Sequence, residues 1–182
     1  DRHDKCGLEA IYLLRSEFDT LTPEEQDFFR RFAFRPSLPQ SYVSPGGFFK
    51  LHYTTSGSGA VSVVDNSGNG IPDYIDEAAL ALDNVHLLYT DTLGYQAPPL
   101  DGIDGNEYDV YIDNLGGGLY GGTAPEGLGL GTQSYLVIDN DFAGSAYFTN
   151  GLDALRVTVA HEYHHMIQMG YFWRSSDRFF MK

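Results

Sequence analysis

Two histidines and a glutamate in one short stretch have the spacing of a metal site with an adjacent base. The stretch is VTVAHEYHHMIQMGY, residues 157–171, with His161, Glu162 and His165 in the pattern H-E-x-x-H. Residues four apart lie on one face of a helix, so both imidazoles can point at one ion. Neutral imidazoles hold Zn²⁺, which lowers the pKa of its bound water towards about 7, and Glu162 is close enough to take the proton. The pattern predicts hydrolysis of a polarised carbonyl compound.

The alternative interpretation is an ordinary helix with surface histidines. Three of the six histidines of the chain lie within residues 161–165. The preceding DALRVTVA is apolar enough to be buried, and a buried helix does not carry ionisable residues without a reason. These observations favour the metal site. His164 lies on another face of the helix, and we expect it to be structural or to support the ligands.

Zinc needs a third protein ligand, which this stretch does not supply. Metzincins continue as H-E-x-x-H-x-x-G-x-x-H. Here Gln168 stands at the glycine position and Tyr171 at the position of the third histidine. The remaining common arrangement is a His₂Glu site whose glutamate comes from the next helix.

A second stretch, DNSGNGIPDYID at residues 65–76, has the ligand spacing of an EF-hand-type loop. Such a loop places oxygen ligands at positions 1, 3, 5, 7, 9 and 12 and a glycine at position 6. The oxygen positions here are Asp65, Ser67, Asn69, the Ile71 carbonyl, Asp73 and Asp76, and Gly70 is the glycine. Ser67 and Asp76 depart from the strict pattern, and Glu77 is a substitute for Asp76. We expect a structural Ca²⁺; the alternative is a turn that enters a helix.

The elements that must position these residues indicate an α/β (α+β) fold, a mixed sheet backed by helices. Apolar spacing predicts helices over residues 7–33, 73–90 and 152–169, the first with a second start at Thr22-Pro23 and Glu25 at the third position. Alternation predicts strands over 47–55, 108–115 and 134–139. Between the last two, residues 116–131 read as a glycine-rich loop without a phosphate-binding motif.

The proline-rich stretch RPSLPQSYVSPGG, residues 35–47, is typical of a linker. It divides a helical pre-segment with its linker, residues 1–44, from a main domain over 45–182. The run FFRRFAFR, residues 28–35, is a phosphate patch or, as such runs more often are, a solvated amphipathic face. The acidic stretch DGIDGNEYD, residues 101–109, fits no ligand register, and we expect a solvated turn.

Composition excludes several classes of partner. The 182 residues include 11 Lys plus Arg against 25 Asp plus Glu, a net charge of −14, which argues against nucleic acid. No run reaches the roughly 20 apolar residues of a membrane span. Acidity, many glycines and tyrosines, and a single cysteine, Cys6, suit a secreted bacterial protein.

The chain resembles a secreted bacterial family of zincin metallopeptidases of the glutamate-zincin type. The resemblance implies a zincin-like upper subdomain, in which a backing helix and the H-E-x-x-H helix pack on a mixed sheet. It also implies hydrolysis of protein or peptide substrates, with His161 and His165 as zinc ligands and Glu162 as general base. The matching motifs are KCG (5–7), FKLHYTTSG (49–57), DNSGNGIPDYIDE (65–77), YDVYIDNLG (108–116) and GLDALRVTVAHEYHH (151–165).

In such a family the third ligand lies just after an aromatic stretch like RFFM, at or slightly past Lys182. We therefore expect a truncated or latent zinc metalloendopeptidase. The alternative is a calcium-stabilised secreted binding or adhesion module that retains the helix without catalysis. A thiolate is a better zinc ligand than water, so Cys6, carried by a segment that linker cleavage would release, is a candidate latency ligand. Its alternative is a lone thiol in an N-terminal helix.

Overall fold

A five-stranded mixed sheet forms the centre of the computed structural model, which describes residues 8–127 and 130–171. The strand order is β1-β2-β3-β5-β4. Strands β2, β3 and β5 run parallel, and β1 and β4 lie antiparallel at the two edges. The mixed α/β fold class expected from the sequence is confirmed. The strands are β1 (Gln40–Val43), β2 (Phe49–Tyr53), β3 (Tyr108–Asp113), β4 (Gly121–Pro125) and β5 (Ser134–Asp139).

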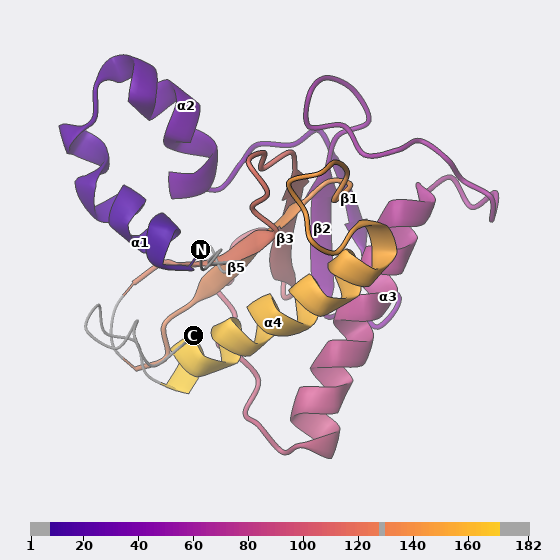
Figure 1. Cartoon of the computed structure of the whole chain (residues 1–182). Helices are drawn as coiled ribbons and strands as arrows, with labels where there is room; N and C mark the ends of the chain where they lie inside the picture. The colour runs from indigo at the N-terminus through magenta and orange to yellow at the C-terminus, as the bar shows by residue number, and fades with distance from the viewer. Residues whose placement is uncertain (1–7, 128–129, 172–182) are drawn as a thin grey trace.

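Two helices, α3 (Asp73–Leu87) and α4 (Gly151–Tyr171), pack side by side on one face of the sheet (Figure 1). A wider helical turn, η2 (Leu88–Thr92), continues α3. Alternate residues of the strands point to this face and form the main core with both helices. That core includes Leu51, Val110, Leu136, Ile138, Leu82, Leu155 and Tyr163, all fully buried.

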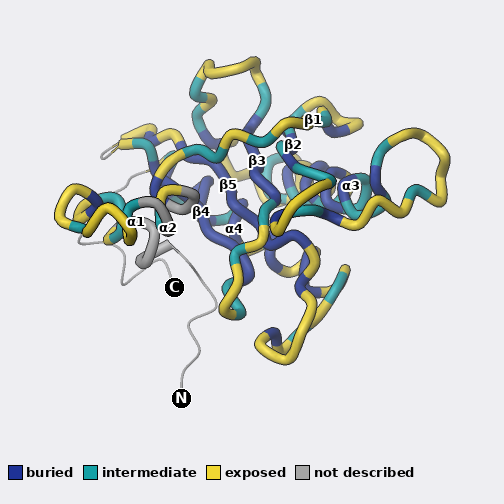
Figure 2. Tube along the Cα trace, turned by 90° about the horizontal axis from the view of Figure 1, so that it is seen from above, coloured by how far each residue is buried: buried dark blue, intermediate teal, exposed yellow. Residues whose placement is uncertain are grey.

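The opposite face of the sheet has its own apolar cluster. Tyr111, Ala124, Tyr135 and Val137 form it, and Leu38 and Leu115 pack against it. The N-terminal helices α1 (Leu8–Glu17), η1 (Phe18–Thr20) and α2 (Pro23–Ala33) lie at this side, and α1 contacts β4. Buried positions concentrate in β2, β3, β4, β5 and α4, whereas β1 and the surrounding loops and turns carry many exposed positions (Figure 2).

The helix signals in the sequence are confirmed. Thr22 caps α2 in a capping box with Glu25, and Pro23 is its first residue. Helix α3 begins at Asp73 as expected but ends at Leu87, and α4 runs two residues further than expected, to Tyr171. These helices show their capping residues and apolar stripes locally, which is why sequence patterns find them.

Two strands were not expected from the sequence. Residues 116–131 are not entirely loop, because residues 121–125 form β4. Glycine is required there: a Cβ on Gly121 would lie 2.8 Å from Thr158 Cγ2 and 2.9 Å from the Val137 carbonyl oxygen. Residues 40–43, assigned to the linker, form β1 and pair with β2. As an edge strand β1 needs only one partner, so the flanking prolines do not exclude it.

Within the described part of the chain, none of the helices is both long enough and apolar enough to cross a lipid bilayer.

Candidate metal centre

The His161 and His165 rings meet on one side of α4. Their Nε2 atoms lie 3.1 Å apart, and the ring planes are nearly perpendicular, at 86°. Two nitrogens bound at about 2.05 Å to one tetrahedral zinc ion lie about 3.3 Å from each other. His165 is buried, at 2% exposure, whereas His161 reaches the surface. The pair therefore fits two adjacent corners of a zinc site that is open towards His161.

Gln168 holds His165 in the tautomer that a metal ligand needs. His165 Nδ1 lies 2.8 Å from Gln168 Oε1. An amide oxygen only accepts, so Nδ1 carries the proton and Nε2 carries the lone pair that a metal ligand needs. Gln168 lies one turn beyond His165, at the i+3 position on the same helix.

Both candidate ligands are uncharged near neutral pH. Burial lowers the pKa of His165 to about 4, with the Gln168 hydrogen bond opposing the shift. Burial also lowers the pKa of His161, and neighbouring His164 adds to the effect. Neutral imidazole is the form that binds metal.

Glu162 follows His161 in α4 and is buried, with a hydrogen bond to the edge strand β4. It is 1% exposed, and its Oε2 accepts a hydrogen bond of 2.9 Å from the Thr123 hydroxyl of β4. Burial raises the pKa of Glu162 to about 7, although the Thr123 bond lowers it in part. A carboxyl group with a pKa near neutrality can both take and return a proton at physiological pH.

The remaining sequence candidates for the zinc site have different places. His164 stacks on Tyr89, at 5.4 Å between ring centres, so it faces α3 and its extension and not the ligand pair. Among residues 8–127 and 130–171, no group of three or more His, Cys, Asp or Glu side chains is arranged to hold a metal. Cys6 and the region of Lys182, where the third ligand is expected, lie outside the described residues.

The loop over residues 65–76 folds around Asp65. Its carboxylate accepts hydrogen bonds from the Ser67 hydroxyl and from the backbone of Gly68, Asn69 and Gly70. These bonds lower the pKa of Asp65, the Gly70 amide most of all. Gly68 and Gly70 have φ of +72° and +85°, which glycine adopts without strain. The loop is thus a tight turn that enters α3.

Only part of the expected calcium set lines one hollow. A surface hollow of about 380 Å³ is lined by Ser67, Asp73, Tyr74, Asp76, Glu77 and Leu152. Asp73 also accepts from the Asn66 backbone at 2.9 Å, and Asp76 accepts from the Asn69 amide at 2.8 Å. Asp65, Asn69 and Ile71 do not line this hollow. The structure therefore brings together three of the six expected ligand positions, Ser67, Asp73 and Asp76, with the substitute Glu77.

Three features were not expected from the sequence, two at the candidate metal site and one elsewhere on the sheet. Thr123 lies in a stretch interpreted as loop, and nothing local marks it as a partner of Glu162. Gln168 could have been found from its i+3 spacing to His165. The stretch 101–109 is not simply a solvated turn, because the side chains of Asp101 and Asp109 are only 7% and 2% exposed and pair with Arg35.

No protein family model, curated protein or solved structure matches this chain.

Proposed function

We propose that this chain is a secreted zinc-dependent metallopeptidase of the glutamate-zincin class. The observation that carries the proposal is the convergence of His161 Nε2 and His165 Nε2 at 3.1 Å, with Glu162 buried on the same helix, one residue after His161. The mixed sheet with α3 and α4 on one face supports it, because this is the arrangement that the sequence resemblance leads us to expect.

His161 and His165 would hold the ion, with a third ligand from beyond the described residues. Zinc, when bound, supplies Lewis-acid activation of water and of a substrate carbonyl. The protein contributes the rest: Gln168 orients His165, and Thr123 orients the Glu162 carboxylate. Glu162, with its pKa near 7, accepts a proton from the attacking water and returns it to the leaving amine.

Peptides and proteins are the proposed substrates, in an extracellular or periplasmic setting. The net charge of −14 and the single cysteine suit such a setting. We also infer that the loop over 65–76 binds Ca²⁺, since Ser67, Asp73 and Asp76 share one hollow with Glu77 and free calcium is plentiful outside cells. Such an ion would tie the loop to the start of α3.

Zinc titration of the full chain tests the proposal. We expect His161→Ala and His165→Ala each to weaken zinc binding by at least tenfold. His164→Ala is the matched control, because it removes a neighbouring imidazole that stacks on Tyr89 instead. Equal zinc affinity in all three variants and the parent chain would contradict the metal site. In an active preparation of the protein, Glu162→Gln should keep zinc and lose peptidase activity.

A further inference from the structure

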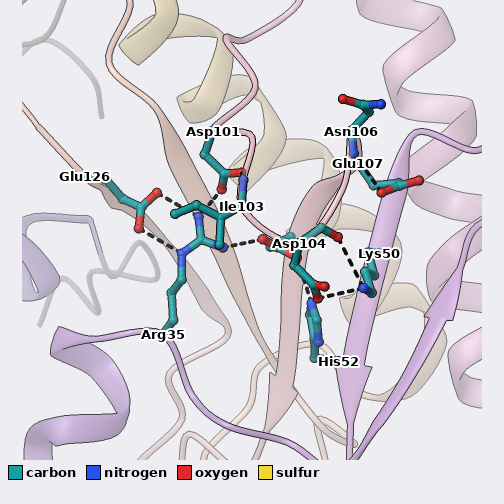
Figure 3. A network of polar contacts seen from close by, with 10 residues as sticks. Arg35, Lys50, His52, Asp101, Ile103, Asp104, Asn106, Glu107 and Glu126 are labelled. Atoms are coloured by element: carbon teal, nitrogen blue, oxygen red, sulfur yellow. Dashed lines mark hydrogen bonds and ion pairs between the residues drawn. The ribbon is translucent and has the colours of Figure 1, made fainter.

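A buried charge cluster lies on the sheet face opposite α3 and α4, away from the candidate zinc site. Arg35, just beyond the end of α2, extends between Asp101 and Glu126 (Figure 3) and also pairs with Asp109 of β3. The Tyr135 ring of β5 lies 5.0 Å from the guanidinium carbon. We refer to Asp101, Asp109, Glu126 and Tyr135 as the Arg35 pocket.

The pocket matches the shape of a guanidinium group and not simply its charge. Arg35 Nε and Nη2 donate to the two oxygens of Glu126, at 2.8 and 2.7 Å, which is the bidentate fork that lysine cannot make. Nη1 donates to Asp109, and Nη2 also donates to Asp101. The aromatic ring adds a cation–π contact. All three guanidinium nitrogens are therefore recognised.

The pocket is held in place by residues outside the N-terminal segment (residues 8–39). The Asp101 carboxylate accepts from the Ile103 backbone at 2.7 Å, and His52 Nε2 lies 2.7 Å from the second oxygen of Asp109. Glu126 follows β4 and is fixed by a backbone bond to Gln133. The geometry of the carboxylates thus comes from the sheet and its loops, as expected for a binding site that is already formed before its ligand arrives.

The charge balance of the pocket demands a cation. Three carboxylates face one guanidinium, and the side chains of Asp101, Asp109 and Glu126 are 7%, 2% and 19% exposed. Burial by itself lowers the pKa of Arg35, but the bonds and attraction to Glu126 outweigh it and leave that pKa above its usual value. Without a cation, the carboxylates would be left close together and poorly solvated.

Tyr135 carries a buried polar group that the ion pairs of Arg35 do not use. It is fully buried, and its hydroxyl has no hydrogen-bond partner in the described structure. Buried hydroxyls normally find one. Arg15 of α1 also approaches the Tyr135 ring, at 5.8 Å, and donates to the Pro125 carbonyl. Two arginines of the N-terminal segment therefore meet at one tyrosine.

We propose that the Arg35 pocket is a binding site for an arginine side chain, filled in this chain by Arg35 and open to competition by an arginine-bearing peptide. Arg35 acts as an intramolecular ligand that fastens the N-terminal segment to the sheet. A peptide arginine presents the same planar fork and makes the same contacts when Arg35 is absent or displaced. Lysine, a compact cation without the fork, binds more weakly.

Substitution of Arg35 in the full chain tests the proposal with N-acetyl-arginine amide as the probe. We expect Arg35→Ala to bind it saturably in the millimolar range, at least tenfold tighter than N-acetyl-lysine amide, with shifts in the Tyr135 and Tyr111 ring resonances. Arg30→Ala is the matched control, since Arg30 lies over the Phe18 and Phe34 rings and not in the pocket. It should behave like the parent chain, in which Arg35 competes for the pocket and the probe binds at least tenfold more weakly than to Arg35→Ala.

Removing a carboxylate from the Arg35 pocket tests whether the probe binds there. The double variant Arg35→Ala, Asp109→Asn should lose the arginine preference. If Arg35→Ala does not fold, Arg35→Lys keeps a cation in place, and N-acetyl-arginine amide should compete with the lysine and bind several-fold more tightly than N-acetyl-lysine amide. A folded variant that binds the arginine and lysine probes equally, or binds neither, overturns the proposal and leaves Arg35 as a fixed internal ion pair.

Discussion

The Thr123 hydroxyl lies 2.9 Å from Glu162 Oε2 and 2.8 Å from the Glu162 backbone oxygen. Both residues are buried. A hydroxyl has one proton, so it donates to one of these acceptors at a time, and the side-chain bond leaves the carboxylate oriented by the edge strand β4. This contact joins the strand to the helix that carries the candidate metal ligands.

Replacing Thr123 should therefore lower the stability of the fold, because Glu162 loses its hydrogen-bond donor. Thr123→Val keeps the shape but removes the donor, and we expect a loss of about 1–3 kcal/mol in the free energy of unfolding, because a buried carboxyl group then lacks its partner. Thr123→Ser retains the hydroxyl and should recover most of the loss. Urea denaturation of both variants measures this, and a serine variant no more stable than the valine variant would count against the bond.

The pH dependence of stability should carry the signature of buried Glu162. In the metal-free chain its folded pKa is about 7, against an ordinary 4.5. The unfolded chain releases this proton at the lower pH, so ionisation of Glu162 destabilises the fold as pH rises through that window.

Glu162→Gln removes this proton, so its unfolding free energy relative to the parent should rise between pH 4.5 and 7, by an amount on the order of 3 kcal/mol. His165 has the opposite effect, because burial lowers its pKa to about 4. The stability that neutral His165 provides is therefore lost as pH falls below the ordinary pKa of histidine. This loss occurs in both proteins and cancels in the comparison. Parallel stability curves for the two proteins, recorded with a chelator, would contradict a raised Glu162 pKa.

The close approach of α4 to β4 depends on Gly121. A Cβ there would meet Thr158 Cγ2 at 2.8 Å and the Val137 carbonyl oxygen at 2.9 Å. Gly121→Ala should cost about 1–3 kcal/mol in unfolding free energy, because backbone atoms cannot turn aside as side chains can. Gly127→Ala is the control, since no atom lies within 4 Å of its added Cβ. Similar stability of the two variants would mean that β4 and α4 shift apart without cost.

The sequence predicted the elements that have strong local signals. The capping box of Thr22 and Glu25, the start of α3 at Asp73 and the alternating strands β2, β3 and β5 all follow from neighbouring residues. It also predicted that His161 and His165 share one face of a helix, because the helical period requires it. The helical period does not predict the direction of the two histidine rings or the burial of Glu162. Both depend on how α4 packs against the sheet.

Features that depend on contacts between residues far apart in the sequence could not be predicted in this way. Strand β4 is rich in glycine and has little strand propensity, and it exists because Gly121 lets α4 pack against it. Arg35 looked like part of a solvated basic run, yet it meets Asp101, Asp109 and Glu126, which lie 66 to 91 residues away. Pairings at such separations leave no periodic trace in the sequence.

Calcium should stabilise the fold through the loop that precedes α3. An ion that binds only the folded chain raises the melting temperature by mass action, by an amount that grows with its concentration. Asp73 is the best single test, because it lines the hollow with Ser67 and Asp76 and also holds the Asn66 backbone. We expect millimolar Ca²⁺ to raise the melting temperature of the parent chain and excess chelator to reverse the rise.

Asp73→Asn should abolish this response while keeping a side-chain acceptor for the Asn66 backbone, so the loop itself should persist. Asp153→Asn is the matched control, because Asp153 is a largely exposed acid in the first turn of α4. The same response in both variants would assign any calcium effect to general screening of the −14 charge. An unchanged melting temperature of the parent chain in calcium and in chelator would show that the turn is held by its own hydrogen bonds around Asp65.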